Sequence, residues 1–133
     1  MAGKLKDGEG MALTESIENY LKAILIIKEK YGEVRRVDLA HYMGYSKASI
    51  SNAVKTLRNQ DCILLVGDRI ELNERGEKIS KEILERHMFF TQLLVNCGVE
   101  YEKALQEACG MEHAISEESF RRIKKTFKTM GAI

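Results

Sequence analysis

The chain has 133 residues, of which 44% are hydrophobic and 31% are charged, and its formal net charge at pH 7 is +1. This composition is typical of a globular protein of one domain or two small lobes, and it excludes a disordered chain. The small net charge excludes a strong overall field for nucleic acid, so any basic surface would have to be local.

No apolar run reaches the roughly 20 residues of a membrane-spanning helix, so no membrane association is expected. Residues 1–12 lack the apolar core of a secretory signal and contain several glycines, which predicts a flexible tail. Cys62, Cys97 and Cys109 are odd in number and widely spaced, which favours reduced thiols over a disulfide framework. Together these features predict a cytoplasmic protein.

Residues 13–32 predict a first helix. Thr14 suits the N-cap position, and Gly32 suits the C-terminal stop. Between them, apolar residues recur at helical spacing, namely Ile17, Leu21, Ile24 and Ile27.

Residues 35–44 and 45–61 predict two further helices. Ser46 is the expected N-cap of the second, and its buried stripe is Ile50, Val54 and Leu57. The break between the two helices is only about three residues long around Gly44, which is typical of a helix-turn-helix.

In residues 62–76 the spacing of the apolar residues is no longer helical. A short apolar run at Ile63–Val66 is followed by Gly67-Asp68 and an alternating segment, which predicts a β-hairpin with a tight turn. A helix-turn-helix followed by such a hairpin is a winged helix, so residues 13–75 are predicted to form a winged-helix domain.

Three more helices are predicted over residues 76–98, 100–114 and 116–130, with Ser116 as the cap of the last. The fold class is therefore mainly α, an N-terminal winged helix-turn-helix followed by an all-helical region over residues 76–133. The apolar faces of these helices need partners, and a homodimer would supply them.

The predicted recognition helix has polar and basic side chains on its exposed face. Lysines and hydroxyls bind phosphate, and asparagine can pair with an adenine edge in the major groove. The predicted DNA contacts are Ser46, Lys47, Ser49, Ser51, Asn52 and Lys55, with Arg69 in the wing. The alternative for each residue alone is an ordinary solvated face, and the order of helix, turn, helix and hairpin favours DNA.

Cys109, Glu112 and His113 stand at positions i, i+3 and i+4, which places them side by side on a helix. A thiolate, a carboxylate and an imidazole suit a divalent first-row metal, and iron, manganese, zinc, cobalt and nickel are all compatible. Glu112 also continues an expected apolar stripe of Tyr101, Leu105 and Ala108, where an ionised carboxylate needs a metal, a cation or a proton.

His87 likewise interrupts an expected apolar stripe, that of Ile79, Ile83, Phe90 and Leu94. Taken singly, Cys109 could be a small buried hydrophobe, His87 a hydrogen-bonded core residue, and Glu112 the partner of a lysine. Taken together, they favour a metal site.

Several segments resemble the diphtheria toxin repressor family of metal-dependent transcriptional regulators, over roughly residues 13–128. The segments are ESIENYLKAI, YSKASISNAVKTLRNQD, LNERGEKI, ERH and EACGMEHAIS, of which the last is the most specific. The resemblance is to the short form of the family, which has no extra C-terminal domain.

The resemblance implies metal ligands at Cys109, Glu112 and His113, and a second-metal role for His87. Asn19 takes the position of a ligand in the first helix, and Lys22 follows where the manganese branch has a carboxylate. Two ancillary ligand positions of the iron branch fall on Thr91 and Leu105.

The resemblance implies a homodimeric repressor, not an enzyme, that binds a near-palindromic double-stranded operator with Fe²⁺ or Mn²⁺ as corepressor. Three alternatives stay open from the residues. They are a winged-helix regulator without metal control, a thiol-based redox sensor that uses Cys109, and a metallohydrolase.

Overall fold

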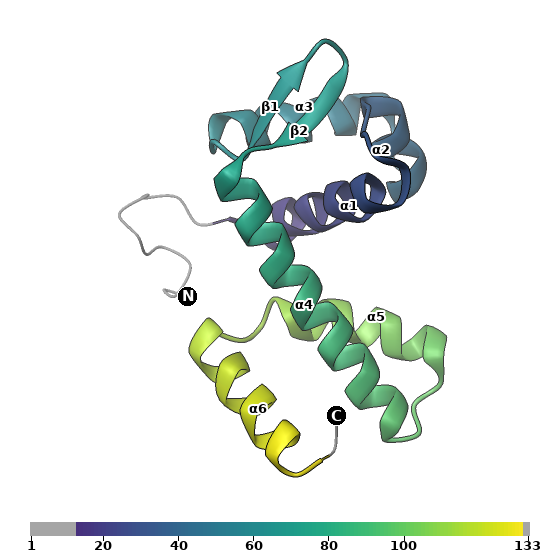
Figure 1. Cartoon of the computed structure of the whole chain (residues 1–133). Coiled ribbons are helices and arrows are strands. Elements are labelled where there is room, and N and C mark those ends of the chain that lie inside the picture. The colour runs from purple at the N-terminus through teal and green to yellow at the C-terminus, as the bar shows by residue number, and fades with distance from the viewer. Residues whose placement is uncertain (1–12, 132–133) are drawn as a thin grey trace. The chain divides into compact units, whose positions relative to one another are not determined.

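The computed structural model describes residues 13–131, and the predicted tail at residues 1–12 lies outside them. The described residues fall into two compact units that divide between Lys81 and Glu82. The first unit contains three helices and a hairpin, and the second is helical (Figure 1). Within residues 13–131, no helix combines the length and apolarity that a bilayer crossing requires.

The first helix of unit 1, α1, spans Glu15–Tyr31. The Thr14 hydroxyl accepts a hydrogen bond from the Ile17 amide at 3.1 Å, and the helix ends where Gly32 adopts a left-handed φ of 92°. Both capping predictions are confirmed, and so is the buried stripe, because Ile17, Leu21, Ile24 and Ile27 are all buried.

The helix-turn-helix consists of α2 (Arg36–Met43) and α3 (Lys47–Asn59). Gly44 ends α2 at φ 72°, a left-handed conformation that glycine adopts without steric cost. The Ser46 hydroxyl then accepts the Ser49 amide at 3.1 Å and caps α3. The predicted three-residue turn is therefore present, and each of its ends has a local cause.

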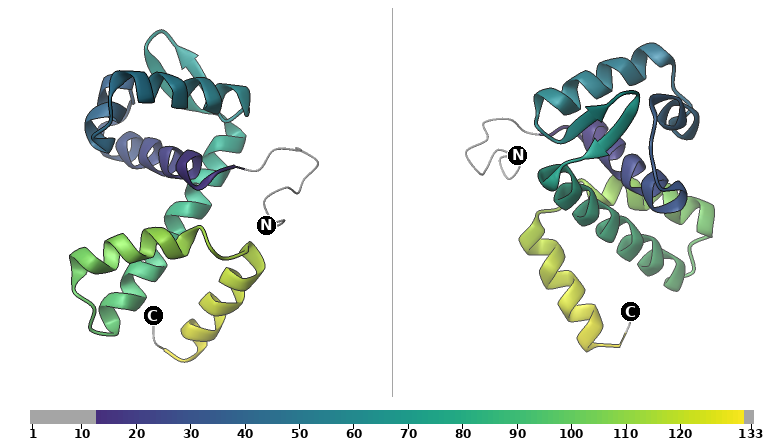
Figure 2. Two further views of the ribbon diagram at one scale, coloured as in Figure 1. Left: turned by 180° about the vertical axis from the view of Figure 1, so that it is seen from behind. Right: turned by 45° about the horizontal axis from the view of Figure 1, so that its top comes forward.

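The wing is an antiparallel hairpin of β1 (Ile63–Val66) and β2 (Arg69–Leu72), in which Val66 pairs with Arg69 across a two-residue turn. Gly67 has a φ of 66° in that turn. Figure 2 shows the hairpin beside the three helices from two further directions. The predicted winged helix is confirmed.

The core of unit 1 is formed by α1, α2, α3 and the inner face of the hairpin. Its largest fully buried members include Leu21, Ile24, Leu39, Ile50 and Leu57. Burial of such apolar side chains away from water is the dominant favourable contribution to folding. It leaves the outer face of α3 free to carry polar side chains.

In unit 1 the start of α4 lies against the short segment between α3 and β1. A Cβ atom placed on Gly76 would lie only 2.0 Å from the carbonyl oxygen of Cys62, so this approach needs glycine. The Asn73 amide donates to the Asp61 carbonyl oxygen at 2.8 Å, and its own oxygen accepts the Gly76 amide at 2.8 Å.

The remaining helices are α4 (Glu74–Asn96), α5 (Tyr101–Glu112) and α6 (Glu117–Thr129). In unit 2 an aromatic cluster joins α4 to α6, with ring-centroid distances of 5.4 Å for Phe89–Phe120 and 5.9 Å for Phe90–Phe120. Ser116 caps α6 as predicted, and its hydroxyl accepts the Ser119 amide at 3.1 Å.

The predicted apolar stripe of α5 was partly wrong. Tyr101 is 58% exposed, and the buried line instead runs through Ala104, Ala108 and Glu112. Both lines have helical spacing, and the alanines of the second line are fully buried. The expected inward direction of Glu112 is confirmed.

Candidate metal centre and nucleic-acid interface

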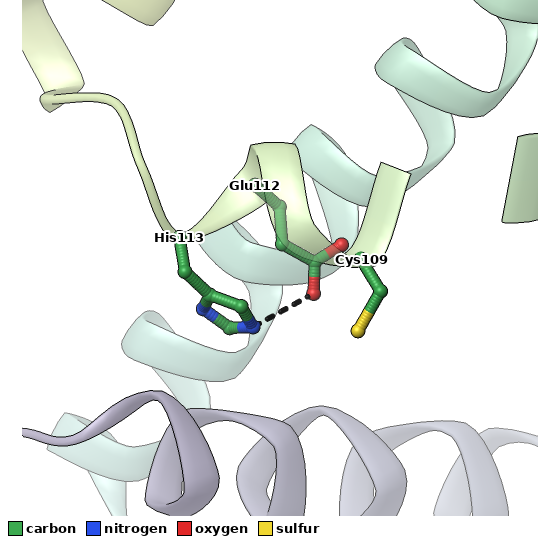
Figure 3. Close-up of side chains that lie close together, drawn as sticks. All are labelled: Cys109, Glu112 and His113. Carbon is green, nitrogen blue, oxygen red and sulfur yellow. Dashed lines mark ion pairs between the residues drawn. The ribbon is translucent and has the colours of Figure 1, made fainter. Parts of the chain in front are cut away.

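The metal candidate is built at the C-terminal end of α5. Cys109 and Glu112 belong to the last turn, and His113 is the C-cap, with right-handed helical backbone angles of φ −95° and ψ −8°. Because the helical geometry continues through His113, the thiol, carboxylate and imidazole point to the same side of the chain (Figure 3). One ligand atom from each residue lies within 4.8 Å of the others.

Glu112 is the centre of this group, and its side chain is fully buried. Nε2 of His113 lies 3.3 Å from Oε2 of the carboxylate. On the other side, Nδ1 of His87 lies 2.8 Å from Oε1, so α4 contributes a second imidazole. A carboxylate in such surroundings is expensive to bury unless polar or charged partners compensate it.

The donor set fits a divalent transition metal. Metal–ligand bonds of about 2.0–2.3 Å place two ligands of one ion at most roughly 4.6 Å apart, which is close to the separations found here. The borderline and soft donors, imidazole and thiolate, suit first-row transition metals, and the carboxylate adds negative charge. The C-terminal end of a helix also favours a cation through its dipole.

The structure brings only some of the predicted ligands together. Cys109, Glu112, His113 and His87 meet within unit 2, whereas Asn19 is half-buried on α1 in unit 1. A role for Asn19 at the metal therefore stays a prediction from the resemblance.

Arg86 is a feature of the site that the sequence did not reveal. Its side chain is only 14% exposed, and it donates to the carbonyl oxygens of Glu112 at 3.2 Å and Ile115 at 2.7 Å. These partners lie 26 and 29 residues further along the chain. The one available signal was that Arg86 directly precedes His87.

The candidate nucleic-acid interface is the outer face of α3. Ser51, Asn52 and Lys55 are exposed there, on the side opposite to the buried stripe, and Lys47 is exposed at the helix start. This surface therefore has amide, hydroxyl and ammonium groups directed to solvent. These are the groups that contact base edges and phosphates.

Three predicted DNA contacts, Ser46, Ser49 and Arg69, already have partners within unit 1. The Ser46 hydroxyl caps α3 and also donates to the Ser49 hydroxyl at 3.1 Å. Arg69 in the wing is near Glu33 at 3.9 Å and Glu71 at 3.7 Å. Surface ion pairs of this kind are weak, so a phosphate can compete for the guanidinium.

A ring contact links α1 to the turn before the recognition helix. Tyr20 of α1 and Tyr45 of the turn form an edge-to-face pair with centroids 6.0 Å apart. Burial, and secondly the neighbouring Tyr45, raise the pKa of the Tyr20 phenol above its ordinary value. The position of α1 is in this way tied to the residue just before the α3 cap.

Comparison with known proteins supports both halves of this description. The model of the iron dependent repressor N-terminal DNA-binding domain matches residues 12–69, and that of the iron dependent repressor metal-binding and dimerisation domain matches residues 73–130. The chain belongs to this family of metal-dependent DNA-binding transcriptional regulators, the diphtheria toxin repressor family, as its sequence predicted.

Among the relatives, the transcriptional regulator MntR of Escherichia coli O6:H1 is 33% identical over 119 residues, covering 89% of this chain and 77% of MntR. The iron-dependent repressor IdeR of Mycobacterium tuberculosis is 30% identical over 115 residues, covering 85% of this chain but only 50% of IdeR.

A solved manganese-dependent transcriptional repressor in complex with manganese superposes with a TM-score of 0.74 at 25% identity, covering 88% of this chain and 53% of that one. The chain thus spans about half the length of IdeR and of this structure.

Proposed function

We propose that the protein is a homodimeric transcriptional repressor whose binding to double-stranded DNA is controlled by Fe²⁺ or Mn²⁺. The observation that carries the proposal is the fully buried carboxylate of Glu112 with the Cys109 thiol and the His113 imidazole beside it. The family match to a metal-binding and dimerisation domain supports it. Zn²⁺, Co²⁺ and Ni²⁺ are also compatible with these donors.

We assign the ligand roles to Cys109, Glu112 and His113, with Asn19 as a further ligand and His87 as a ligand of a second, neighbouring metal. A bound divalent cation would supply the positive charge that holds the thiolate, carboxylate and imidazole together in a buried position. His87 already contacts the Glu112 carboxylate at 2.8 Å, which supports its place in the set. The assignment of Asn19 rests on the resemblance.

The DNA contacts are assigned to the outer face of α3 and to the wing. Asn52 and Ser51 would read base edges in the major groove, while Lys47, Lys55 and Arg69 would neutralise phosphates. A dimer presents two such helices to half-sites whose centres are about 34–36 Å apart, or a multiple of that distance, and this symmetry implies a near-palindromic operator. We place the protein in the cytoplasm.

Control requires that the DNA-competent conformation bind the metal more tightly than the other conformation does. Each ~1.4 kcal/mol of that difference strengthens operator binding tenfold. Within unit 1, α1 packs against α2 and α3, and the Tyr20–Tyr45 contact joins it to the turn. A movement of α1 would therefore change the position of α3, the recognition helix.

The test uses an operator selected from random duplexes by the wild-type protein in the presence of Mn²⁺ or Fe²⁺. Its affinity is then measured with a panel of divalent metals and with a chelator, for the wild type and for Glu112→Gln. We expect metal to strengthen wild-type binding at least tenfold and to have little effect on the variant. Tight wild-type binding that a chelator leaves unchanged would contradict metal control.

A second candidate is a repressor that binds DNA without metal, and one observation favours it. Lys22 on α1 is 9% exposed, and it stands where the resemblance places a carboxylate of the manganese branch. A protonated lysine has no lone pair with which to bind a metal. In the same experiment, this candidate predicts equal operator affinity in metal and in chelator, together with weaker binding by Lys22→Met.

A further inference from the structure

We propose that Arg86 is a positioning residue for the metal centre, an inference that rests on the proposed function. Its guanidinium ties together the end of α5, the connection that follows and the start of α6. Through these contacts it fixes the backbone of Glu112 and His113, so that the ligands are already oriented before metal arrives.

The contacts of Arg86 span three consecutive segments. Nη1 donates to the Glu112 carbonyl oxygen at 3.2 Å and to the Ile115 carbonyl oxygen at 2.7 Å. Nη2 donates to Oε1 of Glu117 in the first turn of α6 at 3.0 Å. The guanidinium also lies over the Phe120 ring, 5.6 Å from its centroid. A planar fork can reach these partners at once, which a lysine ammonium cannot.

Arg86 and His87 together contact both the backbone and the side chain of Glu112. Arg86 binds the backbone carbonyl, and the next residue of α4 contacts the carboxylate at 2.8 Å. The carbonyl of Glu112 belongs to the last turn of α5, where helix carbonyls in general need partners from outside the helix. Without Arg86 this end of α5 would fray, and the fraying segment contains Glu112 and His113.

The sign of the effect distinguishes positioning from simple electrostatics. Removing a cation beside a metal centre would by charge alone tighten metal binding. Loss of a positioning contact weakens it, and neighbours that orient metal ligands are typically worth about 10- to 100-fold in affinity. We therefore expect Arg86→Gln to bind Co²⁺ and Mn²⁺ about 10- to 100-fold more weakly than the wild type.

The experiment titrates Co²⁺ into each full-length variant and follows the thiolate-to-cobalt absorption of Cys109. Arg86→Lys keeps the charge but loses the fork, so it should also weaken binding. Arg122→Gln is the matched control, because it removes the same charge from an exposed ion pair with Glu118 on α6. It should leave the affinity within about twofold, as expected for a solvated pair.

A second readout needs no metal. In the metal-free proteins, amide hydrogen exchange of residues 113–117 should be at least tenfold faster in Arg86→Gln than in the wild type, and unchanged in Arg122→Gln. This readout also serves if Arg86→Gln is unstable, because Glu117→Gln weakens one of the contacts of Arg86 and should show a smaller increase.

The outcomes separate the two proposals. If the wild type takes up neither Co²⁺ nor Mn²⁺, the proposed function fails, and this inference fails with it. If the wild type binds Co²⁺ and Arg86→Gln binds it equally tightly or more tightly, only the positioning role is overturned. Unchanged exchange in residues 113–117 would overturn that role as well.

Discussion

The two units bury different kinds of side chain. Among the described residues, the hydrophobic core of unit 1 has sixteen buried members, whereas that of unit 2 has four, Phe89, Phe90, Ala108 and Phe120, and unit 2 also buries the carboxylate of Glu112. Unit 1 therefore draws its stability mainly from apolar packing, although Lys22 and Ser80 are also buried there, and its proposed DNA contacts on α3 lie on the surface. Unit 2 keeps its functional groups inside, where their stability depends on partners.

The largest effect on stability is expected from a cavity in unit 1. Leu57 is fully buried on α3, and Leu57→Ala should lower the free energy of unfolding by about 2–5 kcal/mol. Leu64→Ala is the control, because Leu64 is 56% exposed in the wing and should change stability by no more than about 0.5 kcal/mol. Urea denaturation measures both, and similar values for the two would contradict the assigned core.

Replacing one glycine in each unit by alanine is expected to change stability in opposite directions. Gly76→Ala would place a Cβ 2.0 Å from the Cys62 carbonyl oxygen, and the required backbone shift should cost about 1–3 kcal/mol. Gly110 lies on α5, and a Cβ there would meet nothing within 4 Å beyond its chain neighbours and the backbone of its own helix, so Gly110→Ala should stabilise the helix by about 0.5–1 kcal/mol. Thermal unfolding of the metal-free variants checks the opposite signs.

The surface role of unit 1 predicts two kinds of loss in DNA binding. Asn52→Ala should cost about 1–3 kcal/mol on the selected operator and relax specificity at one base pair. Lys47→Ala should weaken binding to all sequences. It should also reduce, by about 1, the slope of the logarithm of the binding constant against the logarithm of the salt concentration. Lys103→Ala, an exposed lysine of α5, should have neither effect. Binding isotherms at several salt concentrations separate these cases.

The smallest effect concerns the buried thiol of unit 1. Burial raises the pKa of Cys62 above its ordinary value, so the folded state holds this proton more tightly than the unfolded state. Its contribution is fully present below the unfolded thiol pKa of about 8.5 and is lost as pH rises above it. Stability of the wild type should fall between pH 8 and 10 more than that of Cys62→Ala, with Cys97→Ala, an exposed thiol, as control.

Local sequence signals were sufficient for most of the fold. Thr14, Ser46 and Ser116 cap their helices, and Gly32 and Gly44 end theirs, because each of these roles depends on a few neighbouring residues. The grouping of Cys109, Glu112 and His113 was predictable for the same reason, since i, i+3 and i+4 are neighbours on a helix.

Contacts between distant residues were not predictable from period or spacing. His87 and Glu112 are 25 residues apart, and the fork of Arg86 reaches residues still further along the chain. The exposed Tyr101 shows a second limit, because two lines of α5 had helical spacing and only packing decided which was buried. Tertiary contacts, rather than local pattern, complete the candidate centre of unit 2.

The most direct test of the central claim is anomalous scattering at the manganese edge from crystals of the full chain soaked in Mn²⁺. The account predicts a peak within bonding distance of Sγ of Cys109, a carboxylate oxygen of Glu112 and a nitrogen of His113. The peak should be absent from crystals of Glu112→Gln. A well-ordered wild-type crystal with these three side chains turned apart and no peak between them would contradict it.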